Sequence, residues 1–433
     1  EASMKKLLIA ATVVLVSSSP LVLLPMEKEL TLTPKQVQKL TQNTTASLTQ
    51  FKQIPKNPRT ITTILTYKNK DLTEFKTSIQ ADTKLSISAI FWNAKGEPVF
   101  QLQDGDYVAA SQKSIVDDSI YNQKPVDMTF WTKDGLTVYK EPYVLGTEKA
   151  DSKLASFKPI KVSQAAQTHA GTYYLVDGEG WINASDLSTI DNRIEAVQKV
   201  LNEKYNNQER ISVYVKQLDT DRVAAINDEK SMYAASVAKL GVLYYAQERL
   251  SQKKLSLSDE YQYTSAVNGF PGAYDPDGSG KISKMPDDKN YSLENLLKAV
   301  AQNSDNVATN ILGYYVTNQY DKAFQKSVDK AAATSWNMDK KELTARAAGT
   351  LMEAVYRQNG DIITYLSSTD YDGERISKNI DVPVAHKIGD AYDFKHDVAI
   401  VYADSPFILS IFTDKEGYDK ITSIADDVYG ILK

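Results

Sequence analysis

The chain has no cysteine among its 433 residues, which excludes disulfide bonds, thiolate metal ligands and a cysteine nucleophile. Histidine is also scarce, because only His169, His386 and His396 occur, too few for a histidine-rich metal centre. An excess of one charge is lacking as well: 50 basic residues face 55 acidic ones, without a basic block. This balance gives no case for nucleic-acid binding. We therefore predict a protein without metal or cofactor whose partners are not nucleic acids.

Long apolar runs are missing except near the start of the chain. Lys5 and Lys6 precede the stretch LLIAATVVLV at residues 7–16, a pattern typical of an export signal. Further apolar residues follow, so the segment approaches the lower length limit of a membrane span. We predict that residues 1–26 are either a cleaved signal peptide or a retained membrane anchor. The protein would then lie outside the cell or on the surface of a Gram-positive bacterium.

Two β-rich modules are expected between this segment and the C-terminal half. Residues 27–60 are rich in threonine, glutamine and lysine and are interpreted as a stalk. Short alternating runs with glycine and aspartate turns then predict strands. A weak internal repeat, in which DLTEFK at residues 71–76 matches GLTVYK at residues 135–140, divides these strands into modules at residues 61–120 and 121–188.

The second module contains the stretch TYYLVDGEGWINASDL at residues 172–187. This stretch resembles the GW-type, SH3-like modules of bacterial surface proteins. The resemblance implies that the modules hold the protein on peptidoglycan or another wall polymer, or present the domain that follows. A structural spacer with aromatic residues in its core would explain the same stretch.

The pattern changes over residues 189–433. ISVYVKQL at residues 211–218 predicts a strand near the start of this region, and HDVAIVYA and SPFILSIFTD predict a hairpin over residues 396–414. A mostly helical stretch lies between them, and a last helix is expected at residues 418–432. Strands at both ends with helices between predict an α/β domain, an antiparallel sheet covered by helices with an inserted helical lobe.

One lysine, Lys239, lies in the otherwise apolar run VAKLGVLYYA at residues 237–246. A lysine is rarely buried without a partner or a task, and burial lowers its pKa. Ser236 precedes Lys239 by three residues, so both side chains would share one face of a helix. A neutral amine beside a hydroxyl can take its proton and create a nucleophile. Alternatively, Ser236 caps the helix and Lys239 reaches solvent.

Two later motifs favour the catalytic interpretation. The sequence NSDN places Ser304, Asp305 and Asn306 in a break after an amphipathic helix predicted over residues 291–303. Further on, VPVAHKIGD predicts a strand that carries Lys387. Each motif alone is weak, because S-D-N is a common turn sequence and a lysine on an edge strand means little.

In this order, S-x-x-K, S-D-N and K-x-G resemble the motif set of class A β-lactamases and penicillin-binding proteins. Residues 189–433 are therefore similar to the penicillin-recognising serine hydrolases, most of all to class A. The resemblance implies a β-lactamase/transpeptidase-like fold, acyl transfer to a serine, and a β-lactam-like or peptide substrate.

The resemblance also implies a role for each matching residue. Ser236 would be the acylated nucleophile, and Lys239 would activate it. Ser304 would relay a proton to the leaving nitrogen, and Asn306 would hydrogen-bond the substrate amide. Lys387 would place positive charge near the substrate carboxylate and Ser304.

The oxyanion hole would consist of the backbone N–H groups of Ser236 and Asp390, next to Gly389. Here the sequence departs from the family. Ile388 replaces the threonine of K-T-G, and the Asp390 carboxylate would repel an anionic substrate. Both changes argue against tight binding of penicillins or of a free D-Ala-D-Ala end.

A third departure concerns hydrolysis of the acyl-enzyme. Class A enzymes carry a glutamate with an asparagine four residues later, but SWNMDKKELTARAAG at residues 335–349 contains no such pair. Asp339 and Glu342 are the nearest carboxylates. We therefore expect weak β-lactam turnover.

Two hypotheses follow. The first is an exported class A-like serine hydrolase that acts through a Ser236 acyl-enzyme on cell-wall peptides or other amide or acyl substrates. The second is a catalytically degenerate scaffold that binds the cell wall. The sequence does not separate a hydrolase from a transpeptidase.

Overall fold

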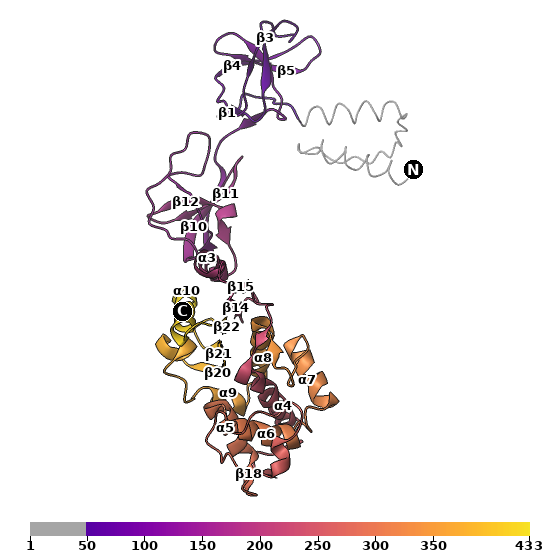
Figure 1. Cartoon of the computed structure of the whole chain (residues 1–433). Coiled ribbons are helices and arrows are strands. Elements are labelled where there is room, and N and C mark those ends of the chain that lie inside the picture. The colour runs from indigo at the N-terminus through magenta and orange to yellow at the C-terminus, as the bar shows by residue number, and fades with distance from the viewer. Residues whose placement is uncertain (1–48) are drawn as a thin grey trace, which may run out of the picture. The chain divides into compact units, whose positions relative to one another are not determined.

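The computed structural model describes residues 49–433, so the predicted export segment and most of the predicted stalk lie outside the described residues. The chain divides into two compact units between Ser119 and Ile120, and each is described by itself (Figure 1). Within residues 49–433, no helix combines the length and the apolar character that a membrane crossing needs.

The first unit contains a five-stranded antiparallel sheet with the order β3-β2-β6-β5-β4 and a short pair of strands, β1 with β7. Phe100 and Val108, paired on neighbouring strands, are fully buried in its core. The strands are β1 (Pro58–Thr60), β2 (Ile64–Tyr67), β3 (Phe75–Ile79), β4 (Ile87–Trp92), β5 (Pro98–Leu102), β6 (Tyr107–Ala109) and β7 (Ile115–Asp117).

The end of the predicted stalk belongs to this fold, which differs from the sequence-based expectation. β1 begins at Pro58, and the ring of Phe51 contacts that of Phe100 with centroids 5.4 Å apart. Threonine-rich composition is misleading here, because the buried hydroxyl of Thr60 donates to the carbonyl oxygen of Gln80 at 2.7 Å. A polar side chain that finds such a partner can be buried at little cost.

The second unit begins with a six-stranded antiparallel sheet of order β13-β8-β10-β11-β12-β9. Its strands are β8 (Tyr121–Thr132), β9 (Val138–Tyr139), β10 (Pro159–Thr168), β11 (Gly171–Val176), β12 (Gly180–Asn183) and β13 (Leu187–Ser188). The GW-like stretch forms the β11–β12 hairpin. Gly180 has a φ of 137°, and a Cβ there would lie 2.5 Å from the carbonyl oxygen of Tyr139, so only glycine fits. An SH3-like architecture for the two modules stays a prediction.

The rest of the second unit is organised around a five-stranded antiparallel sheet of order β15-β14-β22-β21-β20. Its strands are β14 (Ile211–Gln217), β15 (Val223–Ile226), β20 (Val384–Ala391), β21 (Phe394–Val401) and β22 (Phe407–Asp414). Strands from both ends of this region therefore pair with each other, since β14 lies beside β22. The expected α/β fold with an antiparallel sheet and helices is confirmed.

Helices cover this sheet on both faces (Figure 1). α3 (Arg193–Tyr205) and α10 (Tyr418–Leu432) pack on one face, and α8 (Ala345–Gln358) packs on the other. The inserted helical lobe lies beyond α8 and consists of α4 (Leu240–Ser251), α5 (Leu293–Asn303), α6 (Asn306–Tyr315), α7 (Lys322–Ala332) and α9 (Asp361–Leu366).

Strand β20 sends alternate side chains to the two faces. Ala385 belongs to the core on the α8 side, and Val384 belongs to the core on the α10 side. Lys387 therefore points toward the helical lobe, whereas His386 and Asp390 point toward α10. β20 is also the edge strand of this sheet, so one side of its backbone is not paired with another strand of it.

Candidate active site

The predicted nucleophile lies in a tight turn rather than at the start of an α-helix. Residues Ala235–Lys239 form a 3-10 helix, and α4 starts only at Leu240. Residues three apart in a 3-10 helix lie above one another, so Ser236 and Lys239 share one side of the turn. Ala235 adopts a left-handed φ of 50°, a strained conformation that is common at functional sites.

Lys239 is fully buried. Its Nζ donates to the backbone oxygen of Ser304 at 2.7 Å and to Asn306 Oδ1 at 2.6 Å. A third, longer contact joins Nζ to Ser304 Oγ at 3.5 Å. A neutral amine has two hydrogens and one lone pair, so the two short bonds use both hydrogens and the lone pair can accept a proton from a hydroxyl. Among residues 49–433, no hydrogen bond joins Lys239 Nζ to Ser236 Oγ. Catalytic hydrogen bonds are often loose before the substrate binds.

Burial lowers the pKa of Lys239 well below its ordinary value, and the positive charge of Lys387 lowers it further. The Asp305 carboxylate opposes this shift, and the ring of Tyr274, whose centroid lies 4.5 Å from Nζ, also favours the ammonium form. A cation–π contact contributes about 2 kcal/mol, whereas full burial shifts a lysine pKa by up to about 3–5 units, or about 4–7 kcal/mol. Burial therefore dominates, and the amine is suited to act as a base.

The S-D-N sequence forms the break between α5 and α6. Ser304 directly follows α5 as its C-cap, has a left-handed φ of 53° and is fully buried. Asp305 caps α6, because its Oδ1 accepts from the N–H of Ala308 at 2.8 Å. Its Oδ2 accepts from the N–H groups of Lys281 at 2.6 Å and Ile282 at 2.9 Å. Asp305 thus fixes both the turn and a neighbouring loop.

Asn306 makes two bonds within the protein. Its Oδ1 accepts from Lys239, and its Nδ2 donates to the carbonyl oxygen of Asp275 at 2.7 Å. The role that the resemblance implies, a bond to the substrate amide, would use the second hydrogen of Nδ2. The structure adds a positioning role, since Asn306 holds the amine of Lys239.

Lys387 reaches Ser304 from β20. Its Nζ donates to Ser304 Oγ at 2.8 Å and to the carbonyl oxygen of Ile388 at 3.0 Å. Burial lowers the pKa of Lys387 to about 7, against the opposing influence of Asp397. The structure therefore brings Ser304 into contact with two lysines, because Lys239 Nζ also lies 3.5 Å from its Oγ.

Gly389 allows β20 to lie directly against the nucleophile turn. A Cβ at this position would lie 2.5 Å from the carbonyl oxygen of Ala234 and 3.2 Å from the backbone nitrogen of Val237. These two residues flank the turn around Ser236. The expected oxyanion donors, Ser236 and Asp390, therefore lie on two segments in close contact.

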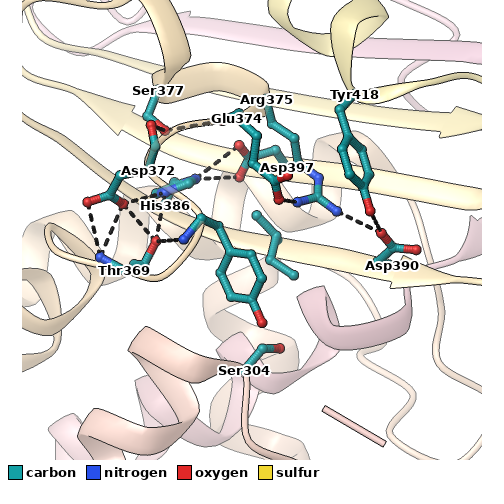
Figure 2. A network of polar contacts seen from close by, with 12 residues as sticks. Ser304, Thr369, Asp372, Glu374, Arg375, Ser377, His386, Asp390, Asp397 and Tyr418 are labelled. Atoms are coloured by element: carbon teal, nitrogen blue, oxygen red, sulfur yellow. Dashed lines mark hydrogen bonds and ion pairs between the residues drawn. The ribbon is translucent and has the colours of Figure 1, made fainter. Parts of the chain in front are cut away.

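The Asp390 carboxylate is paired within the protein. Its Oδ2 accepts from Arg375 Nη2 at 2.9 Å and from the hydroxyl of Tyr418 (Figure 2). Arg375 is only 1% exposed and also pairs with Glu374. Its guanidinium carbon lies 3.8 Å from the ring centroid of Tyr418.

His386 lies in a charge cluster on the sheet face opposite to Lys387. Its Nδ1 lies 3.0 Å from Asp397, and its Nε2 lies 3.0 Å from Asp372 and 3.1 Å from Thr369 Oγ1 (Figure 2). The two carboxylates raise its pKa to about 9 although burial opposes them. A ring held as imidazolium cannot serve as a general base, so this apparent triad anchors a loop.

His396 is neutral. Burial lowers its pKa to about 4, its Nδ1 accepts from the N–H of Thr413 at 3.0 Å, and its Nε2 donates to the carbonyl oxygen of Tyr233 at 2.8 Å. Its ring stacks on Phe412 at 4.1 Å between centroids. It supports the strands next to the nucleophile turn.

The loop expected to carry a deacylating carboxylate presents a lysine instead. Asp339 and Glu342 are exposed, whereas Lys341 is buried. Lys341 Nζ donates to the carbonyl oxygens of Gly272 at 3.0 Å and Met338 at 2.9 Å, and burial lowers its pKa. It lies 4.5 Å from the Tyr274 ring centroid, the same distance as Lys239 Nζ.

Sequence reasoning missed Lys341, Tyr274 and Arg375. No local pattern marks them, because each is defined by contacts with segments far away in the chain. Within residues 49–433, no group of three or more histidine, aspartate or glutamate side chains is arranged to hold a metal ion.

Comparison with known protein families gives two matches. The model described as the beta-lactamase enzyme family matches residues 192–432, more than half of the chain. A domain of unknown function, DUF5776, matches residues 50–116 in the first unit. Comparison with curated proteins gave no match.

Solved structures with similarity include one of PBP-A, at 15% identity and a TM-score of 0.45, covering 56% of this chain and 96% of that chain. An acyl-enzyme complex of a PBP-A mutant with penicillin G matches at 15% identity and a TM-score of 0.45, covering 55% and 95%. A β-lactamase from Sphaerobacter thermophilus matches at 14% identity and a TM-score of 0.44, covering 55% and 95%.

Proposed function

Because this chain belongs to the beta-lactamase enzyme family, we propose that it cleaves an amide or related acyl bond through an acyl-enzyme on Ser236. One observation carries the proposal. The amine of Lys239 is fully buried on the same side of the turn as Ser236, and its two short hydrogen bonds match the two hydrogens of a neutral amine, whose lone pair would take the serine proton.

Acylation forms the bond between Ser236 Oγ and the acyl carbon. The hydroxyl proton moves to Lys239 Nζ, and the carbonyl oxygen becomes an oxyanion that the backbone N–H groups of Ser236 and Asp390 stabilise. When the carbon–nitrogen bond breaks, the leaving nitrogen takes the proton of Ser304 Oγ. Ser304 recovers a proton from Lys239, 3.5 Å away, which restores the neutral amine.

Lys387 supports this relay through its charge. Its ammonium group donates to Ser304 Oγ at 2.8 Å, so it stabilises negative charge that develops on Ser304 during proton transfer. The same charge lowers the pKa of Lys239. This effect adds to that of burial, which is the larger cause.

Deacylation is expected to be slow with β-lactams. Water must attack the ester carbon and pass a proton back to Ser236, but the carboxylates nearest in sequence to this role, Asp339 and Glu342, are exposed. The buried group beside Tyr274 is Lys341, which donates its hydrogens to two carbonyl oxygens. An acyl-enzyme that persists is the predicted result.

We further propose that the protein is exported, that its N-terminal modules hold it on a wall polymer, and that its substrate is a wall peptide. The support is the sequence pattern of residues 1–26 and the GW-like stretch at residues 172–187. Binding of the full chain to purified peptidoglycan, compared with a chain that lacks residues 49–188, tests the wall-binding part.

The acyl-enzyme is tested with the full chain, a fluorescent penicillin and a panel of muropeptides and activated esters. Intact-protein mass spectrometry should find an adduct on the wild type and on the control Ser256→Ala, which changes an exposed serine. The Ser236→Ala variant should show none. Absence of an adduct with every donor would support a degenerate scaffold and refute the proposal.

A further inference from the structure

We propose that Asp390 sets the charge preference of this site: its carboxylate binds Arg375 and thereby favours acyl substrates that lack a free carboxylate next to the scissile bond. This inference rests on the proposed acyl-enzyme function. It assigns a specificity role to an ion pair that the catalytic steps do not use.

The backbone of Asp390 lies next to the turn that holds the proposed nucleophile. It follows Gly389, the residue at which β20 contacts the turn that holds Ser236. Its side chain is 34% exposed, in contrast to the fully enclosed guanidinium of Arg375. The carboxylate therefore faces solvent on one side and its cation on the other.

Arg375 cannot serve an incoming carboxylate in this arrangement. Nη2 donates to Asp390, Nη1 pairs with Glu374, and the ring of Tyr418 covers the guanidinium carbon. Two acidic side chains thus neutralise one buried cation. The hydroxyl of Tyr418 donates to Asp390 and fixes the carboxylate in place.

Lys239 and Lys387 do not take the place of Arg375 as a partner for a substrate carboxylate. Lys239 has a strongly lowered pKa, and its hydrogens are bound to Ser304 and Asn306. Lys387 has a pKa of about 7 and donates to Ser304 and to the carbonyl oxygen of Ile388. Neither of these two lysines is therefore available to pair with an anionic substrate group at Asp390.

The surface beyond Asp390 is apolar and aromatic. Tyr392 is 86% exposed, and its ring lies 5.8 Å from that of Tyr233 between centroids. Phe394 lies 6.3 Å from Tyr233. Such a surface beside a carboxylate suits a substrate that continues as an uncharged or cationic chain.

The first test compares benzylpenicillin with its methyl ester as acyl donors for the full chain. Replacing Asp390 with asparagine removes the like charge and leaves Arg375 available. The ratio of the acylation rates, acid over ester, should rise by about tenfold in Asp390→Asn, as expected from removal of one nearby like charge. The ratio cancels the intrinsic reactivity of the two compounds.

Asp393→Asn is the matched control, because Asp393 is exposed in the following turn and the variant has the same net charge. Its acid-to-ester ratio should equal that of the wild type. An unchanged ratio in Asp390→Asn, or an equal rise in both variants, would overturn the proposal. A salt titration of the wild type needs no variant: screening should raise the rate of the acid relative to the ester, and a flat ratio contradicts the proposal.

Binding to catalytically blocked protein separates this inference from the proposed function. In Ser236→Ala, the amide of N-acetyl-D-alanyl-D-alanine should bind more tightly than the free acid. The double variant with Asp390→Asn should shift this preference toward the acid by about tenfold. If no protein forms an acyl adduct, the proposed function fails while this preference can still hold. Equal affinities, or no binding of either peptide, overturn the preference itself.

Discussion

Replacement of Lys239 by methionine is expected to stabilise the protein and abolish acylation at once. The methionine chain has a similar length and fills the same buried space without an amine. Loss of the base should lower the rate of Ser236 acylation by about 10²–10⁴-fold. The effect on stability has the opposite sign, because burial of the lysine disfavours its charged form.

The magnitude follows from linkage. Each unit by which burial lowers the pKa of Lys239 costs about 1.4 kcal/mol of folding free energy at a pH below both pKa values. The variant loses the bonds to Ser304 O and Asn306 Oδ1, and orphaned acceptors cost about 1–3 kcal/mol each. For replacement of a buried ionisable group by an apolar one, we expect a net gain of about 1–2 kcal/mol near pH 6.

The pH dependence of the stability difference shows whether the lowered pKa of Lys239 is its cause. With a folded-state pKa below the unfolded one, the unfolded chain binds more protons, so wild-type stability is highest above the unfolded pKa and falls as pH decreases toward the folded pKa. The variant lacks this slope. Its advantage over the wild type should therefore shrink between pH 6 and pH 9.

Urea unfolding of the full chain, read by pulse proteolysis of peptides from α4 and α5, measures this difference within the correct domain. A variant that is less stable than the wild type by an amount independent of pH would mean that Lys239 is buried as an ammonium ion. The assignment of Lys239 as the base would then be wrong.

The other predictions concern residues on β20. The acylation rate should decline as pH rises through about 7, where Lys387 loses its charge. Lys387→Arg should remove this decline because arginine stays protonated. An identical dependence of the rate on pH in both proteins excludes Lys387 as the titrating group. Gly389→Ala should reduce acylation about 10²-fold, since its Cβ would lie 2.5 Å from Ala234 O and must displace the nucleophile turn; unchanged rates refute the close contact. The stability that His386 contributes should be complete below pH 6.5 and disappear as pH rises through about 9, because its pKa is raised on folding. His386→Gln should lower the free energy of unfolding by about 3 kcal/mol at pH 6 and remove this dependence of stability on pH. If the pH dependence persists in the variant, another group causes it.

Some features of the site could be predicted because they follow from local pattern. The amphipathic spacing before NSDN predicts a helix that ends where α5 ends, at Asn303, and the S-D-N sequence suits a helix end followed by a cap. The final helix, Tyr418–Leu432, was marked by its spacing alone. In each case the residues that decide the structure lie within one or two turns of each other.

Other features could not be predicted, because distant segments create them. Ser236 lies in a 3-10 helix, since the turn is held between β20 and the helical lobe rather than by its own helix propensity. The sequence places a carboxylate at Asp390, but its pairing with Arg375 depends on the approach of a distant segment. Likewise, the composition around Thr60 suggests a polar stalk, but in the folded unit its hydroxyl donates to the carbonyl oxygen of Gln80.

The sequence by itself determined the order of the three motifs, the helix-and-strand pattern around them and the absence of thiol chemistry, because these depend on residue types and short spacings. Tertiary structure alone decided that Lys239 is desolvated, that Lys387 and Lys239 both contact Ser304, and that Arg375 forms an ion pair with Asp390. The physical reason is that burial and charge pairing depend on which distant segments exclude water from a group, and no local spacing encodes that.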